Sequence, residues 1–217
     1  MSTEEKVRDH FQADASRFDA IYEDAGKGPF ARFVDDVWRG VVKQRLKLAL
    51  ERLQPAEGRR FLDVGCGSGR FCLEYAARGA SHVLGVDVAP AMIEIANQLA
   101  RERGLSDRCA YRTGRFPDDV PETGFDYASA IGYFDYVAEP LAHLVALRER
   151  TTRCLIMSFP KRWEWRVPFR RLRFWRSGCP LYLYSATDVQ RLLGGAGLTR
   201  CEWIRTDRDY VVIARLD

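Results

Sequence analysis

The residues with the clearest chemical potential lie in one glycine-rich stretch, which runs from Phe61 to Phe71. A short apolar run containing an acid, Asp63, comes before three alternating glycines, Gly65, Gly67 and Gly69. Residues without a Cβ let the backbone turn tightly and approach a ligand closely. The stretch therefore predicts a buried strand, a ligand-binding turn and the start of a helix.

The acids around this turn favour an amine-bearing ligand over a dinucleotide. The dinucleotide fingerprint needs a glycine at position 70, where this chain has Arg70. Asp63 precedes the first glycine and suits a cationic amine, whereas Asp87 ends the next apolar run and could accept both hydroxyls of a ribose. The same residues have a purely structural interpretation: the glycines would let helix and strand pack closely, and Asp87 would cap a helix.

The rest of the chain indicates a single α/β domain spanning residues 1–217. From Arg59, short apolar runs alternate with helical segments, which is typical of βαβ crossovers in a mainly parallel sheet. The last two runs, Leu198–Arg205 and Tyr210–Arg215, are joined by a short polar link, which favours an antiparallel pair. We expect four parts: a helical lid at 1–57, a cofactor-binding core at 58–160, a basic and aromatic acceptor-side segment at 161–184, and a closing helix and strand pair at 185–217.

Four segments resemble the class I S-adenosylmethionine-dependent methyltransferases, namely Phe61–Phe71, Gly85–Met92, Phe125–Tyr133 and Ser185–Arg215. The resemblance covers roughly Arg59 to Arg215, apart from the basic segment. It implies a Rossmann-like three-layer α/β sandwich around a seven-stranded, mostly parallel sheet, with one antiparallel strand inserted at the C-terminal hairpin. It also implies S-adenosyl-L-methionine as the cofactor and methyl transfer as the activity.

The resemblance assigns the cofactor to residues that follow the predicted strands. Asp63 would orient the methionine amine and Asp87 would hold the ribose. Arg115 stands where many relatives have an aspartate for the adenine amine, so Phe116 could stack on the adenine and Asp118 could supply the carboxylate. The predicted cofactor-binding residues, of which Ile131 and Gly132 would border the sulfonium, are Asp63, Gly65, Cys66, Gly67, Gly69, Asp87, Val88, Met92, Phe116, Ile131 and Gly132.

Three side chains after the fourth predicted strand are the candidates for catalysis. Methyl transfer mainly requires an acceptor atom held in line and the exclusion of water, and a general base matters most for a hydroxyl acceptor. Tyr133 and Asp135 lie where ligands bind, beyond the carboxyl ends of strands, and His143 follows in the next helix. Asp135 could equally cap that helix, and His143 could be a surface or packing residue. The three candidates slightly favour O-methylation over N-methylation.

The segment from Lys161 to Arg176 concentrates the positive charge. It has seven basic residues and one acid, while the whole chain has a net charge of +4, so the remainder is faintly acidic. After Pro168, a helix would place Phe169, Leu172 and Trp175 on one face. An anionic acceptor held by arginines, peripheral contact with an anionic membrane through 161–176, or a solvated basic surface would each explain the charge. One local patch on an otherwise acidic chain argues against nucleic acid.

Composition gives no sign of a membrane span, a signal peptide or a metal site. No run approaches about 18 apolar residues, the first residues are polar and acidic, and the six cysteines form no C-x-x-C pair. We therefore expect a cytoplasmic enzyme, at most peripheral to a membrane, that binds no metal and methylates a small molecule. Its oligomeric state is left open. Two alternatives fit parts of the pattern: a nicotinamide-dependent oxidoreductase, and a non-catalytic S-adenosylmethionine-binding regulatory protein.

Overall fold

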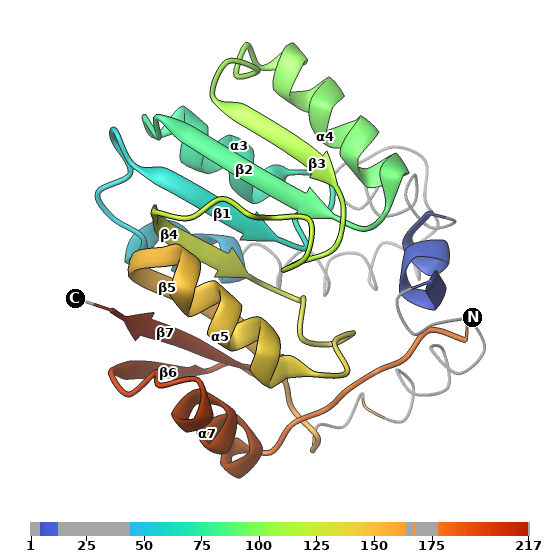
Figure 1. Cartoon of the computed structure of the whole chain (residues 1–217), viewed down its shortest axis with the longest axis vertical. Helices are drawn as coiled ribbons and strands as arrows, with labels where there is room; N and C mark the ends of the chain where they lie inside the picture. Colours follow the sequence, from blue (N-terminus) through green and yellow to red (C-terminus); the bar gives the residue numbers. More distant parts are fainter. Residues whose placement is uncertain (1–4, 13–43, 164–166, 168–177, 217) are drawn as a thin grey trace.

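One seven-stranded sheet organises the protein in the computed structural model, which describes residues 5–12, 44–163, 167 and 178–216 (Figure 1). The strand order is β3-β2-β1-β4-β5-β7-β6, and β7 runs antiparallel to both of its neighbours while the other described pairs are parallel. The predicted fold is therefore confirmed, including the single antiparallel strand. The strands are β1 (Arg60–Val64), β2 (His82–Asp87), β3 (Cys109–Thr113), β4 (Phe125–Ala130), β5 (Thr151–Pro160), β6 (Cys201–Arg205) and β7 (Asp209–Arg215).

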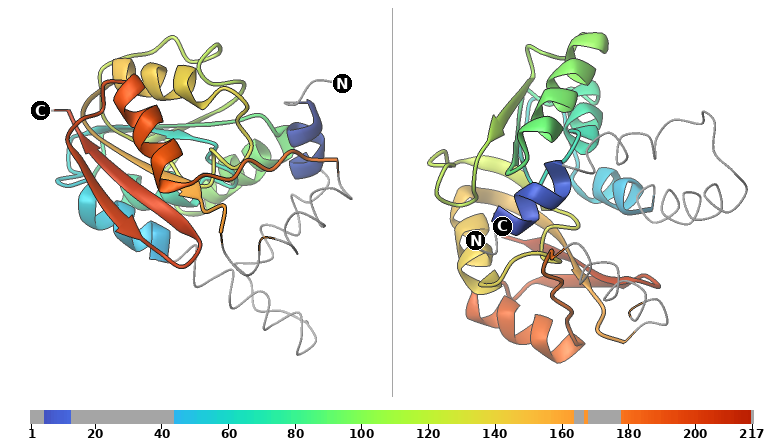
Figure 2. Two further views of the ribbon diagram at one scale, coloured as in Figure 1. Left: turned by 90° about the horizontal axis from the view of Figure 1, so that it is seen from below. Right: turned by 90° about the vertical axis from the view of Figure 1, so that its right-hand side faces the viewer.

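Helices cover both faces of this sheet and give the predicted three layers. Figure 2 shows α5 and α7 on one side of the sheet and the helical residues 44–52 on the other. The two hydrophobic clusters follow the same division, because one contains side chains of α5 and α7 and the other contains those of 44–52, α3 and α4. The labelled helices are α3 (Arg70–Ala77), α4 (Pro90–Glu102), α5 (Pro140–Arg150) and α7 (Ala186–Gly195).

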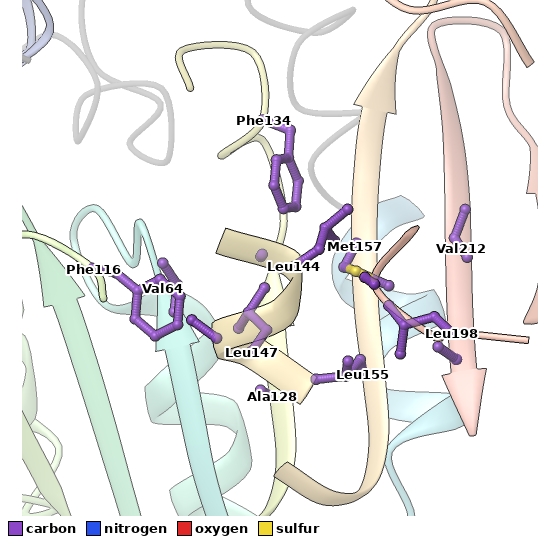
Figure 3. Packing of buried hydrophobic residues seen from close by; sticks show 14 of the residues in the cluster. Val64, Phe116, Ala128, Phe134, Leu144, Leu147, Leu155, Met157, Leu198 and Val212 are labelled. Atoms are coloured by element: carbon purple, nitrogen blue, oxygen red, sulfur yellow. The ribbon is translucent and has the colours of Figure 1, made fainter. Parts of the chain in front are cut away.

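The central strands are apolar on both faces, as strands between two helical layers must be. In β1, Phe61 belongs to one cluster and the next residue, Leu62, to the other. Figure 3 shows how Leu144 and Leu147 of α5 lie against side chains of the sheet, among them Leu155. This packing fixes the carboxyl ends of the strands, where the loops that could carry a site begin.

Parts of the predicted lid and of the basic segment lie outside the described residues. Helical residues 5–12 and 44–52 belong to the predicted lid. The helix expected after Pro168, with Phe169, Leu172 and Trp175, lies outside the described residues. A capping box begins α7: the Ser185 hydroxyl accepts a hydrogen bond from the Asp188 backbone N–H, and the Asp188 carboxylate accepts one from the Ser185 N–H.

Candidate functional site

A cavity of about 550 Å³ lies at the carboxyl ends of the parallel strands, a size within the range of small-molecule sites. At this point β1 is flanked by β2 on one side and β4 on the other. The connections that follow neighbouring strands there pass to opposite faces of the sheet. Every predicted cofactor-binding residue except Gly69 lines it, and so do the three catalytic candidates, Tyr133, Asp135 and His143.

The three glycines of the loop have different structural roles. All have positive φ angles, of 71°, 52° and 75° for Gly65, Gly67 and Gly69. A Cβ at Gly65 would lie 2.9 Å from the Tyr133 ring, and one at Gly69 would lie 2.6 Å from the Tyr111 ring. At Gly67 a Cβ would meet nothing within 4 Å. The backbone of Gly67 is therefore open for a ligand, whereas Gly69 leaves room for Tyr111.

Replacing Gly69 by alanine should lower the free energy of unfolding by about 2–4 kcal/mol, because the new Cβ combines a strained φ with a clash against Tyr111. Gly104→Ala is the matched control. Gly104 also has a positive φ, of 64°, but no atom lies within 4 Å of its ideal Cβ, so only the conformational cost of about 1–2 kcal/mol applies. Urea denaturation would measure both changes. Equal losses in the two variants would show that the Tyr111 contact is unimportant.

Asp87 ties the glycine loop to the next helix. One of its carboxylate oxygens accepts the Gly67 N–H and the other accepts the Ala89 N–H, each at 2.9 Å. Burial raises the pKa of this carboxyl, and the backbone hydrogen bonds partly offset the rise. A carboxylate oxygen has room for more than one donor, so the structural and the ribose-binding interpretations of Asp87 are compatible.

The first helical residues cover the end of the cavity next to Asp87. Val7 and Phe11 line the cavity, and the Gln12 side-chain oxygen accepts a hydrogen bond from the Ala91 N–H at 3.1 Å. Phe11 also packs against the cluster of Val7 and Cys179 and against the cluster of Ala89 and Met92. This end is therefore apolar, as an adenine ring requires.

Of the two residues predicted after β3 for the adenine, Phe116 lines the cavity and Asp118 does not. Phe116 is buried, and its ring faces the Arg150 guanidinium at 5.5 Å and the His143 ring at 6.1 Å. Asp119, the neighbour of Asp118, accepts the Arg115 N–H at 2.7 Å.

Two of the three catalytic candidates meet directly. The Tyr133 hydroxyl lies 2.8 Å from His143 Nδ1. Asp135 is buried, and its carboxylate lies 3.5 Å from an amino group of Arg208. The alternative role of Asp135 as a helix cap is wrong, since Glu139 occupies the N-cap position of α5.

Sequence reasoning missed a buried charge cluster, which we define as Arg45, Asp135, Arg208 and Asp209. Arg45 donates to one oxygen of Asp209 through Nε at 3.0 Å and through Nη2, and Arg208 lies 3.9 Å from the other oxygen. Burial disfavours the charged guanidinium of Arg45, but Asp209 and Asp135 outweigh it and raise its pKa. Both arginines line the cavity. The pairing joins residues far apart in the sequence, so no local sequence pattern predicts it.

The part of the chain that the structure describes has neither a metal-binding cluster nor a membrane-spanning helix. No group of three or more His, Cys, Asp or Glu side chains is arranged to hold a metal ion there. Within the same residues, no helix is both long enough and apolar enough to span a bilayer.

The sequence model of the methyltransferase-domain family matches residues 30–202. Among curated proteins, the chain is 38% identical over 128 residues to the tRNA U34 carboxymethyltransferase of Alcanivorax borkumensis, covering 56% of this chain and 38% of that one. The enzyme of the same name from Pseudomonas aeruginosa is 35% identical over 131 residues, covering 57% and 38%. The chain thus spans about two-fifths of the length of these relatives.

Solved structures share the fold over the whole chain. The magnesium protoporphyrin IX methyltransferase of Synechocystis PCC 6803, with bound S-adenosylhomocysteine, superimposes with a TM-score of 0.79 at 20% identity and covers 100% of both chains. The geranyl diphosphate C-methyltransferase of Streptomyces coelicolor gives 0.75 at 14% identity and covers 99% and 98%. At these identities the likeness shows the fold alone.

The comparisons correct the predicted partners. The expectation that nucleic acid is an unlikely partner is wrong, because the curated relatives are named for a tRNA substrate. Confinement of the positive charge to one segment was therefore not a sufficient reason to exclude a nucleic-acid partner. The expected small-molecule acceptor and membrane contact are set aside with it.

The loop and its acids fit the proposed cofactor, since Gly67 leaves backbone open to the cavity and Asp63 and Asp87 line it. The family match also decides against an oxidoreductase and against a non-catalytic binder. This chain belongs to the methyltransferase-domain family and is an S-adenosyl-L-methionine-dependent methyltransferase.

Proposed function

We propose that this enzyme transfers a methyl group to a hydroxyl oxygen of a uridine nucleotide in RNA. The observation that carries the proposal is the match to tRNA U34 carboxymethyltransferases, at 38% identity over 128 residues. The chain spans about two-fifths of the length of those relatives. We therefore propose only the reaction in this cavity and not the relatives' other properties.

The Tyr133–His143 pair supports an oxygen acceptor. S-adenosylmethionine supplies an activated methyl group when bound. A hydroxyl acceptor must lose its proton during the transfer, so a nearby base increases the rate. The Tyr133 ring lies against Gly65 and its hydroxyl contacts His143 Nδ1. Tyr133 would bind the acceptor oxygen, and His143 would take the proton through it.

The charge cluster supports a negatively charged group in the same cavity. Guanidinium groups bind carboxylates and phosphates well, and both Arg45 and Arg208 line the cavity. RNA carries phosphates, which are ligands of this kind. The run of basic residues between Lys161 and Arg176, read from the sequence, would add attraction for an RNA backbone.

Replacing Tyr133 by phenylalanine should lower kcat by about 10²-fold, because the proton path to His143 is lost. The ring against Gly65 remains, so the affinity for S-adenosylhomocysteine should stay within about threefold of the wild-type value. Single-turnover rates and titration calorimetry would measure the two effects. A His143→Gln variant should show a similar decrease in kcat. A normal rate in Tyr133→Phe together with a slow His143→Gln would remove Tyr133 from the proton path.

Transfer of label from methyl-labelled S-adenosylmethionine to bulk bacterial tRNA tests the acceptor class. The tRNA is digested to nucleosides, and mass spectrometry identifies the labelled one and its added group. A parallel reaction contains the small-molecule fraction of a cell extract, and heat-inactivated enzyme is the control. Label in a uridine nucleoside supports the proposal. Label confined to the small-molecule fraction would overturn it.

A further inference from the structure

A polar network lies beneath the glycine loop, around the carboxylate of Asp63. Asp63 is the next-to-last residue of β1 and pairs directly with Ser129 of β4 in the sheet register. The Ser129 hydroxyl donates to one Asp63 oxygen at 2.7 Å, and the Cys72 thiol donates to the other at 3.5 Å. Asp63 and Ser129 are only 3% and 1% exposed. Both oxygens of a buried acid thus have a donor supplied by a different element of the fold.

The surroundings of Asp63 determine how easily it ionises. Burial raises the pKa of its carboxyl to about 7, and the hydrogen bonds from Ser129 and Cys72 oppose that rise. Asp87, at the end of β2, is its charged neighbour among the described residues and raises the pKa further. The other ionisable groups nearby are the Cys66 thiol of the loop and the Tyr75 hydroxyl of α3, whose own pKa values are raised by burial, so both are neutral at physiological pH.

We propose that Ser129 and Cys72 are positioning residues for the cofactor, which hold the Asp63 carboxylate ionised and directed at the cavity where the methionine amine binds. The proposal rests on Asp63 being the acid that binds that amine. It does not depend on the nature of the acceptor, so it stands or falls separately from the RNA proposal.

A cationic amine binds the ionised acid and gains little from the protonated one. The affinity for the cofactor should therefore fall tenfold for each pH unit below the pKa of Asp63. A hydrogen bond donated to a carboxylate stabilises its charged form and lowers its pKa. Removing the Ser129 hydroxyl should raise the pKa and move the loss of affinity to higher pH.

The test is the dissociation constant of S-adenosylhomocysteine, measured by titration calorimetry between pH 5.5 and 8. In the wild type the affinity should be level near pH 8 and should fall below a midpoint near pH 7. Ser129→Ala should move the midpoint up by about one pH unit, and Ser129→Thr, which keeps the hydroxyl, should restore it. Cys72→Ala should cause a smaller shift in the same direction, because a thiol is a weak donor.

Cys154→Ala is the matched control. Cys154 is a buried thiol of the same hydrophobic cluster as Cys72, but its sulfur contacts the Leu155 carbonyl. Its replacement should leave the midpoint unchanged. A Ser129→Ala variant that binds more weakly by the same factor at every pH would show a purely structural role and overturn the proposal.

A second measurement covers the case in which Ser129→Ala does not fold. The carboxyl carbon resonance of Asp63 can be titrated by NMR in the ligand-free wild type and in Cys72→Ala. A midpoint near 7 that rises in Cys72→Ala supports the proposal. A midpoint near 4, or one that does not respond to Cys72, would contradict it.

Discussion

Asp87→Ala should weaken the binding of S-adenosylhomocysteine by at least about 100-fold, or about 2.7 kcal/mol. The carboxylate accepts the Gly67 and Ala89 N–H groups, so its loss frees the one glycine whose backbone is open to the cavity. It would also remove the predicted acceptor for the ribose hydroxyls. The support of the loop and the contact with the ribose are lost together, so this is the largest expected effect on the affinity for the cofactor. Titration calorimetry measures it directly.

Two variants show whether the effect belongs to the site. Asp87→Asn keeps the shape of the side chain and one acceptor oxygen, so its affinity for S-adenosylhomocysteine should fall by about 10-fold. Asp126→Ala removes another acid that accepts a backbone N–H, that of Arg60 at 3.0 Å, but Asp126 does not line the cavity. Its affinity should equal that of the wild type. A loss in Asp126→Ala as large as that in Asp87→Ala would mean that Asp87 acts only through general stability.

Asp209→Asn should lower the free energy of unfolding by about 3–5 kcal/mol, because it leaves the buried Arg45 guanidinium without its main partner. The pair ties helical residues 44–52 to the start of β7. Both side chains are almost fully buried, with exposed fractions of 7% and 0%. Urea denaturation of the ligand-free protein measures the change.

An exposed ion pair between helical residues 44–52 and the neighbouring strand β6 is the matched control. Arg52 lies 2.7 Å from Glu202 of β6, with side-chain exposed fractions of 32% and 43%. Glu202→Ala should lower the free energy of unfolding by less than about 1 kcal/mol. Replacing both buried partners, as in Arg45→Met with Asp209→Leu, should recover most of the stability lost in Asp209→Asn. Similar losses in Asp209→Asn and Glu202→Ala would contradict the assignment of a buried, mutually dependent pair.

The features predicted correctly from the sequence are those that depend on local spacing. The alternation of short apolar runs with helices is set by burial on both faces of β1 and its neighbours. The glycine turn at Gly65–Gly69 and the closing hairpin β6–β7 are equally local. Since parallel strands end at the same edge of the sheet, the residues that follow them had to meet in one cavity.

What the sequence could not reveal are contacts between distant segments. Gly69 looked like a ligand-binding glycine, but its missing Cβ accommodates Tyr111 of β3. Phe116 lines the cavity as predicted, but its contacts with Arg150 and His143 join segments far apart in the sequence. The pairing of Arg45 with Asp209 arises only when the sheet is complete.

The predicted acceptor failed for a different reason. The prediction that nucleic acid is an unlikely partner depended on the positive charge being confined to one segment of a chain whose remainder is faintly acidic. The relatives named for tRNA show that such a distribution does not exclude a nucleic-acid partner. Two further arginines, Arg45 and Arg208, line the cavity, and their position there depends on the fold.

The most direct test of the central claim is a calorimetric titration of the full chain with S-adenosylhomocysteine at pH 8, followed by a competing titration with NADH. The cavity between the glycine loop and the charge cluster predicts one site, with a dissociation constant of about 1–50 µM, and no displacement by NADH. The absence of binding at about 1 mM ligand, or saturable binding of NADH at the same site, would contradict the assignment of this cavity to the methyl donor.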